Sequence, residues 1–444
     1  MTAPQTPPPH PSFREMFLYW LKLGFISFGG PAGQIAIMHT ELVERRRWIS
    51  EKRFLHALNY CMLLPGPEAT QLATYIGWMM HRTWGGLVAG GLFVLPSVFI
   101  LIALSWIYMA YGEVPAIAGL LYGIKPAVVA IVLAAAWRIG SRALKHPALW
   151  LISIAAFCAI GLFEVPFPYI VAAAALAGAI GARFAPRVFS ADGGHGAAAR
   201  HYGPAIIDDD TPTPEHARYR PRHLLAVAAA GIGLWAAVLG ALALVFGWHG
   251  TLAQMGWFFT KAALLTFGGA YAVLPYVYQA AVENYQWLTA TQMIDGLALG
   301  ETTPGPLIMV VAFVGFVGGW SQALFGAEHL FLAGATAAFV AAFFTFLPSF
   351  LFIFAGAPLV EATHGDLKFT APLTGITAAV VGVVVSLGVF FAQHVFVVAG
   401  RADWIAIGGA ALALVALVRF KVGLIPLILA MGGAGMLLRL SGLS

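Results

Sequence analysis

The chain is a succession of apolar stretches, most of them long enough to cross a lipid bilayer. A helix needs about 20 predominantly apolar residues to span the hydrocarbon core. Strands of a transmembrane barrel would instead alternate apolar and polar residues, and no such alternation is present. The pattern predicts an all-α polytopic membrane protein, with apolar stretches at 13–38, 54–80, 84–111, 114–137, 148–163, 165–182, 223–247, 253–278, 290–319, 329–358, 370–392, 403–418 and 422–440.

Polar interruptions divide the chain into four parts. A Pro-rich tail covers 1–12, and a first apolar series covers 13–182. The segment 183–222 holds Gly-Gly, three consecutive aspartates and two Thr-Pro pairs, and a second apolar series covers 223–444. We expect 183–222 to be a flexible linker on the membrane surface.

Composition supports the membrane assignment and limits the chemistry. Of 444 residues, 60% are hydrophobic and 10% are charged, whereas soluble domains are about a quarter charged. Cys61 and Cys158 lie in apolar context, and the thirteen histidines show no metal-ligand spacing. We therefore expect no metal, no cofactor and no nucleic-acid partner, with the lipid bilayer as surroundings and a homodimer as an open possibility.

The two apolar series repeat one another. A lysine, a Phe-Gly-Gly motif and a Pro-Gly-Pro motif of the first series each recur in the second series 239 residues later, without gaps. Further along the chain the offset is 252, which maps Leu95-Pro96-Ser97 onto Leu347-Pro348-Ser349. One register held across separate motifs indicates two homologous halves. The pairs at the first offset are Lys22 and Lys261, Phe28 and Phe267, Gly29 and Gly268, Gly30 and Gly269, Pro65 and Pro304, Gly66 and Gly305, and Pro67 and Pro306.

The charges of equivalent loops indicate that the halves are inverted. The loop 39–56 carries five Lys and Arg residues, whereas its counterpart near 278–295 carries none. Cytoplasmic loops of membrane proteins are enriched in Lys and Arg. Equivalent loops therefore lie on opposite sides of the membrane, with 39–56 cytoplasmic, as in many secondary transporters built from inverted repeats.

The FGG and PGP motifs are predicted to be tips of re-entrant hairpins. If 13–38 and 54–80 each dip into the membrane and return, nearly every basic residue of the first half falls on the cytoplasmic side. Glycine permits unusual backbone angles at such a tip, and proline starts a new half-helix. A half-helix N-terminus presents free N–H groups and a positive dipole end, which favour an anion.

Several motifs together resemble the chromate ion transporter family in its long, two-domain form. They are FGGP, RRRWIS, LLPGPEATQLATYIG, a second FGG, YQWLTATQM and ETTPGPL, and the resemblance covers nearly the whole chain. It implies export of chromate across the bacterial inner membrane, giving chromate resistance, with coupling to protons and with sulfate as a competitor or alternative substrate. The residues alone predict an inverted-repeat transporter for an anion.

Candidate substrate-binding residues gather at the tips and at three lysines. Lys22 and Lys261 either contribute positive charge beside a dianion or snorkel to the interface. Lys125 is expected at a helix break made by Pro126. It either takes part in substrate binding or coupling, or anchors the helix at the membrane interface. The hydroxyls and amide of Thr70, Gln71, Thr302 and Thr303 either bind oxyanion oxygens or satisfy backbone groups freed by the breaks.

Two acids adjoin the PGP tips. Glu68 follows the first triplet, and Glu301 precedes the second. A carboxylate beside an anion site repels the anion unless it is protonated, so both are candidate proton carriers. The alternative for Glu68 is compensation of the half-helix dipole.

Two other functions fit the sequence less well. Undecaprenyl-pyrophosphate phosphatases also have inverted repeats, but their Pro-Gly is followed by Ser and Arg, whereas Pro65-Gly66 is followed by Pro67-Glu68. Without a nucleophile and a guanidinium clamp, phosphoryl chemistry has little support, so neither an enzyme nor catalytic residues are expected. A passive anion channel is disfavoured by the acids beside the tips.

Overall fold

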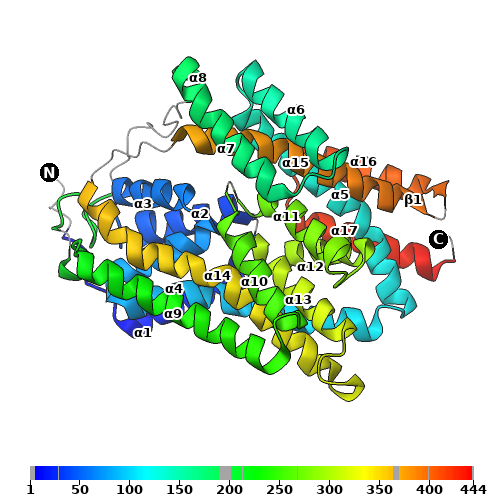
Figure 1. Ribbon diagram of the computed structural model, residues 1–444, viewed down its shortest axis with the longest axis horizontal. Helices are drawn as coiled ribbons and strands as arrows, with labels where there is room; N and C mark the ends of the chain where they lie inside the picture. The colour runs from blue at the N-terminus through cyan, green and yellow to red at the C-terminus, as the bar shows by residue number, and fades with distance from the viewer. Residues whose placement is uncertain are drawn as a thin grey trace.

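The computed structural model describes residues 6–28, 30–189, 202–212, 214–267, 269–363, 370–398 and 400–442. It is almost entirely helical, as the apolar pattern predicts (Figure 1). The first half contains α1 (Phe13–Ile26), α2 (Gly30–His39), the π-helical turn η1 (Thr40–Arg45), α3 (Glu51–Leu63), α4 (Glu68–Tyr111), α5 (Pro115–Ala143), α6 (Pro147–Gly161), α7 (Phe167–Phe184) and the short α8 (Pro186–Phe189).

The second half repeats this order after the short η2 (Glu215–Ala217) and the additional helix α9 (Pro221–Phe246). A two-residue antiparallel pair, β1 (Val397–Val398) with β2 (Arg401–Ala402), joins α15 to α16. The other elements are α10 (Thr251–Leu264), α11 (Ala270–Tyr278), η3 (Gln279–Asn284), α12 (Ala290–Thr302), η4 (Leu307–Met309), α13 (Val310–Ser321), η5 (Ala327–His329), α14 (Leu330–Thr363), α15 (Thr370–Phe396), α16 (Trp404–Val418) and α17 (Leu424–Leu440).

The structural repeat follows the sequence repeat closely. The π-helical turn at 40–45 recurs at 279–284, and α3 at 51–63 recurs as α12 at 290–302, both at the offset of 239. Helix α9 is long and apolar enough to cross a membrane. It adds one membrane crossing between the two halves. This crossing reverses the orientation of the second half across the membrane relative to the first. The two homologous halves predicted from the sequence are therefore an inverted repeat.

The predicted re-entrant hairpins are also confirmed. Helix α1 has 14 residues and α3 has 13, so at 1.5 Å per residue neither exceeds about 21 Å, short of a hydrocarbon core of about 30 Å. Helix α4 has 44 residues but is interrupted by non-helical His81 (φ −136°) and Arg82 (φ 55°). Its first part returns to the surface, and its second part crosses the membrane.

The halves interlock rather than lie side by side. Helix α14 packs against α4 of the first half, and α15 packs against α5, α6 and α7 (Figure 1). Helix α17 crosses α5 at very close range: a Cβ built on Gly123 would lie 2.0 Å from the carbonyl oxygen of Met431. Small residues allow membrane helices to approach in this way, so dispersion contacts replace a hydrophobic driving force that lipid does not supply.

The described part of the linker is packed against the first half. Ile207 forms a parallel β-bridge with Ile49, with N–H groups of Ile207 and Ser50 donating across it at 3.0 and 2.9 Å. His216 lies 3.0 Å from the carbonyl oxygen of Trp78. The linker was expected to be flexible because Gly, Asp and Thr-Pro dominate it. That expectation overlooked the apolar pair Ile206-Ile207, which anchors it.

The α5–α17 crossing generates a stability prediction. Gly435→Ala places a Cβ 2.4 Å from Cα of Gly123, and we expect this overpacking to cost about 1–3 kcal/mol. The measurement is the Tm of the detergent-purified protein. Gly433→Ala, two residues away on the same helix with nothing within 4 Å of the new Cβ, is the matched control and is expected to unfold like the wild type. Equal Tm values for the two variants would show that the crossing is looser than described.

Candidate functional site

The tips of the two halves are hydrogen-bonded to each other. The N–H of Gly66 donates to the carbonyl oxygen of Thr266, and the N–H of Gly305 donates to that of Ser27, both at 2.8 Å. Ser27 and Thr266 are equivalent positions, as are Gly66 and Gly305. Each PGP tip is therefore bound to the FGG tip of the opposite half, so the four hairpin tips form two pairs, each of which joins the halves.

The glycine at each PGP tip is required by both conformation and space. Gly66 has φ +119° and Gly305 has φ +104°, in the region that side chains disfavour. A Cβ on Gly66 would lie 2.5 Å from Oγ of Ser349, and one on Gly305 would lie 2.7 Å from Cβ of Ser97. The two serines belong to the repeated Leu-Pro-Ser motif, so each faces the tip of the other half.

Two glutamines complete the lining of the tips. Nε2 of Gln71 donates to the carbonyl oxygen of Pro65 at 2.8 Å and lies 3.5 Å from Oγ of Ser349. Nε2 of Gln34 donates to the carbonyl oxygen of Gly305. Both side chains are fully buried. They hold the exposed backbone of the tips, as broken helices at membrane depth require.

Several polar atoms here are buried and lack a hydrogen-bond partner among the described residues. They are Oε1 of Gln34, Oγ1 of Thr70, Oε1 of Gln71 and Oγ of Ser97. A buried polar group without a partner costs about 1–3 kcal/mol. The hydroxyls of Thr70 and Ser97 can donate to a ligand, whereas Oε1 of Gln34 and Oε1 of Gln71 can only accept, because their Nε2 groups already donate to the tip carbonyl oxygens. Unused polar groups at the paired tips are what a polar ligand would satisfy.

Half-helices begin at every tip. Helix α2 starts at Gly30, α4 at Glu68, α11 at Ala270, and η4 with α13 at Leu307. The first N–H groups of a helix have no partner within it, and its N-terminal end is positive. Such ends at the paired tips favour a bound anion without any lysine or arginine in contact with it.

The two tip carboxylates have different surroundings. Glu68 lies in the first turn of α4, as the sequence predicts, and is partly exposed. Within the described chain it forms no hydrogen bond or ion pair. Glu301 is 7% exposed and accepts a hydrogen bond from the hydroxyl of Tyr271. One acid thus has no hydrogen-bond partner within the described chain, and the other is enclosed beside the second tip.

The candidate lysines are not in contact with the tips in the described structure. Lys22 is exposed on α1, and the ammonium of Lys261 lies 5.7 Å from the ring centroid of Trp257. Lys125 forms an ion pair with Asp295, with Nζ 3.6 Å from Oδ2. The expected helix break at Pro126 is wrong, because α5 continues from 115 to 143 through this proline. A proline removes one helical hydrogen bond, which neighbouring helices can tolerate.

The other predicted site residues fall into three groups. Pro65, Pro67, Pro304 and Pro306 flank the tip glycines, and Phe28 and Phe267 are partly buried beside them. The hydroxyls of Thr302 and Thr303 donate to carbonyl oxygens of Leu299 and Gly300 at 2.8 and 2.9 Å, so they satisfy their own helix. Gly269 has φ +99°, and Gly30 has φ +68°. Gly29 and Gly268 lie outside the described residues.

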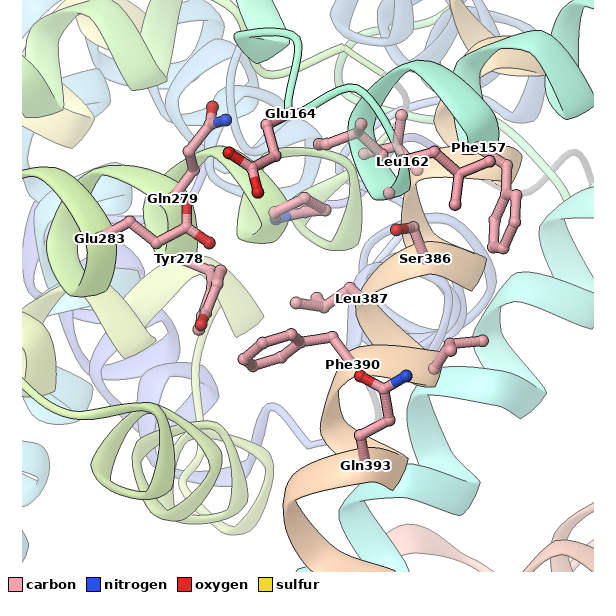
Figure 2. A pocket seen from close by; sticks show the side chains of 15 residues that line it. Phe157, Leu162, Glu164, Tyr278, Gln279, Glu283, Ser386, Leu387, Phe390 and Gln393 are labelled. Carbon is pink, nitrogen blue, oxygen red and sulfur yellow. The ribbon is translucent and has the colours of Figure 1, made fainter.

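A separate cavity of about 320 Å³ opens among the α6–α7 loop, α11 with η3, and α15 (Figure 2). Figure 2 shows the carboxylates of Glu164 and Glu283 directed into it, beside Gln279, Tyr278 and Ser386. Burial raises the pKa of Glu283, and the adjacent Glu164 raises it further. A lining of this charge repels a dianion, so the tips are the better candidate for an anion site.

Metal binding finds no support in the described chain, where no cluster of three or more His, Cys, Asp or Glu side chains is placed to hold an ion. Sequence reasoning missed Gln34, Ser97 and Ser349. The repeated Leu-Pro-Ser motif was used only to align the halves, although a polar residue repeated within an apolar helix is itself a signal. Gln34 has no such signal, because its counterpart is Val273.

Inverted halves whose broken hairpins meet at depth define an inverted-repeat membrane transporter. The sequence model of the family described as "Chromate transporter" matches residues 14–179 and 253–436, one match in each half. The chain therefore belongs to the chromate transporter family.

Similar proteins support this assignment. A "Chromate transport protein" of Pseudomonas aeruginosa is 34% identical over 98% of this chain and 94% of its own length. A "Chromate transport protein" of Cupriavidus metallidurans is 29% identical over 86% of this chain and 83% of its own length. The "Uncharacterized transporter YwrA" of Bacillus subtilis is 31% identical over 29% of this chain and 73% of its own. No solved structure matches the chain.

The tip geometry generates a prediction. Gly66→Ala and Gly305→Ala combine a disfavoured φ with a contact of 2.5 or 2.7 Å, so the tips must separate. We expect transport to fall at least about tenfold, equivalent to about 1.4 kcal/mol on the rate-limiting step. The measurement is initial transport rate per amount of folded protein. Gly300→Ala, on α12 with its nearest contact at an ordinary 3.5 Å, is the control. Wild-type rates in both tip variants would contradict the tip assignment.

Proposed function

We propose that this chain exports chromate across the bacterial inner membrane in a proton-coupled cycle and thereby gives chromate resistance. The main support is the family membership together with two relatives named as chromate transport proteins. The structural observation that carries the proposal is the pairing of half-helix ends at the tips, beside buried polar atoms that lack a hydrogen-bond partner among the described residues. Such a site suits a tetrahedral dianion.

The substrate would be held by neutral groups. Backbone N–H groups at the tips and the hydroxyls of Thr70 and Ser97 donate to the oxyanion oxygens. Hydrogen bonds to a charged acceptor are roughly twice as strong as neutral ones. No cationic side chain has to be desolvated, and release does not require a tight ion pair to be broken. Sulfate has the same shape and charge as chromate, so we propose it as the competing or alternative substrate.

Glu68 and Glu301 are proposed as the proton carriers. Glu68 lies in the first turn of the half-helix whose end faces the anion, so its charged form repels a dianion. Protonation removes this repulsion, so the proton and the anion bind together and cross in the same direction, because linkage is reciprocal. A dianion with one proton carries net negative charge, so the inside-negative membrane potential favours its movement outward. Glu301 occupies the corresponding region of the other half, where the Tyr271 hydroxyl holds it.

The orientation is proposed from charge. The loop 39–56 carries the arginine cluster, and the packed linker lies against that same loop. By the bias of Lys and Arg toward the cytoplasm, we place both on the cytoplasmic side. The alternative of a lipid-pyrophosphate phosphatase is disfavoured, because the described tip residues supply neither a guanidinium clamp nor an activated nucleophile.

Chromate flux into everted membrane vesicles tests the function directly. With the medium made more acidic than the vesicle lumen, we expect uptake of radiolabelled chromate that collapses when the gradient is dissipated and that sulfate reduces. Vesicles from cells lacking the protein are the control. Flux that ignores the gradient would point to exchange or a channel. Sulfate uptake without chromate uptake would keep the architecture and overturn the substrate.

The role of Glu68 generates its own prediction. Glu68→Gln is permanently neutral, so we expect anion affinity to lose its dependence on pH, while the pH gradient no longer drives accumulation. In the wild type the affinity should weaken as pH rises, because the carboxylate ionises. The measurements are chromate affinity and gradient-driven uptake across a pH series, with exposed Glu328→Gln as the control. A pH profile unchanged from the wild type would return Glu68 to dipole compensation.

A further inference from the structure

A buried network links the two halves near the face that carries loop 39–56. The guanidinium of Arg53, on α3, pairs with the carboxylate of Glu361 at the end of α14. The hydroxyl of Tyr75, on α4, donates to the other oxygen of the same carboxylate. The side chain of Glu361 is 2% exposed. A PGP hairpin of the first half is thus tied to the long helix of the second.

A second network makes the reverse connection. The hydroxyl of Tyr108, on α4, donates to Oδ2 of Asp295 on α12 at 3.0 Å, and Nζ of Lys125 lies 3.6 Å from the same oxygen. Here a PGP hairpin of the second half is tied to the long helix of the first. Each network combines one cation, one carboxylate and one tyrosine.

The two networks lie at corresponding distances along the long helices of the two halves. Tyr108 maps at the offset of 252 onto residue 360, next to Glu361. On α14, Glu361 of the first network lies twelve residues beyond Ser349. On α4, Tyr108 of the second network lies eleven residues beyond Ser97. At 1.5 Å per residue these separations are about 18 and 17 Å. Because the halves are inverted, the networks lie on opposite sides of the tips, near the two boundaries of a hydrocarbon core of about 30 Å.

Both networks are formed in this structure, and the tips between them are closed. Gln34, Gln71 and Ser97 are each 0% exposed. We propose that Arg53–Glu361–Tyr75 and Lys125–Asp295–Tyr108 are the two gates of the transport cycle, which open in turn to admit solute from opposite faces. Each gate joins a hairpin of one half to a helix of the other, so relative movement of the halves must break one of them.

The two gates differ in strength. Arg53 also donates to the carbonyl oxygens of Asp208 at 3.3 Å and Thr211 at 2.9 Å, so the packed linker is fastened to the first gate. In the second gate the ion pair is longer, and Oδ1 of Asp295 has no partner among the described residues. The second gate is therefore the easier one to open, and the resting protein should favour access from the face opposite loop 39–56.

The test measures access rather than transport, so it can be read whether or not chromate proves to be the substrate that the proposed function names. Ser97→Cys, in a background with Cys61→Ala and Cys158→Ala, places a thiol of similar size at the tips. Its rate of reaction with a membrane-impermeant thiol reagent is measured in right-side-out and in everted vesicles. Each gate variant is added to this reporter.

Variants of the two gates are expected to change the labelling rates from the two membrane faces in opposite directions. Glu361→Gln should raise labelling from the face of loop 39–56 about tenfold and lower labelling from the other face, because opening one gate shifts the population. Asp295→Asn should do the reverse. Exposed Glu328→Gln should change neither rate. Equal shifts in the same direction, or no shift in either variant, would overturn the assignment.

A charge exchange separates gating from general destabilisation. Lys125→Asp alone and Asp295→Lys alone should each open the second gate, whereas the two together should restore the wild-type ratio of labelling from the two faces. A role limited to stability would change the Tm without moving that ratio. Failure of the exchange to restore the ratio, in a double variant with wild-type Tm, would refute the second gate.

Discussion

The structure depends on satisfying backbone groups where lipid offers no hydrogen-bond partner. Breaking a helix at membrane depth frees N–H and C=O groups, and each one left alone costs several kcal/mol. Here the two halves supply each other: Gly66 donates to Thr266 and Gly305 donates to Ser27. Neither half can satisfy its own tips in this way. In this structure the inverted repeat thus supplies partners that the broken hairpins need, and the glycines follow from the close approach.

The same constraint shapes the site. Because backbone donors and neutral side chains already converge at the tips, an anion can be bound without a lysine or arginine nearby. The sequence drew attention to Lys22 and Lys261, because a symmetric pair of charges within apolar segments suggests function. One is exposed and the other lies over Trp257, as cationic side chains near an interface do when they snorkel. Charge near the tips comes instead from the carboxylates of Glu68 and Glu301, which is why the proposed cycle depends on their protonation state.

The fold was largely predictable, because its causes are local or periodic. Apolar stretches define the helices, one register defines the repeat, and arginines define the inversion. The contacts between the halves were not predictable, because they join residues far apart in the chain, such as Gly66 and Thr266, which are 200 positions apart. No local pattern shows that Ser97 faces Gly305 or that Arg53 meets Glu361. Lys125 has no acid near it in sequence, and only the tertiary structure brings Asp295 to it.

Departures from symmetry give a symmetric scaffold a direction. A perfect inverted repeat has equal energies in its two facing states, so any preference must come from residues that the repeat does not duplicate. Lys125 corresponds to Thr377, Arg53 to Gln292 and Glu68 to Leu307. These positions hold the cations of both gates and the acid at the first tip. The linker adds a further asymmetry, because its carbonyl groups bind Arg53 and stabilise one gate only. Directional transport on this scaffold thus rests on a few unmatched charges rather than on the helices that carry them.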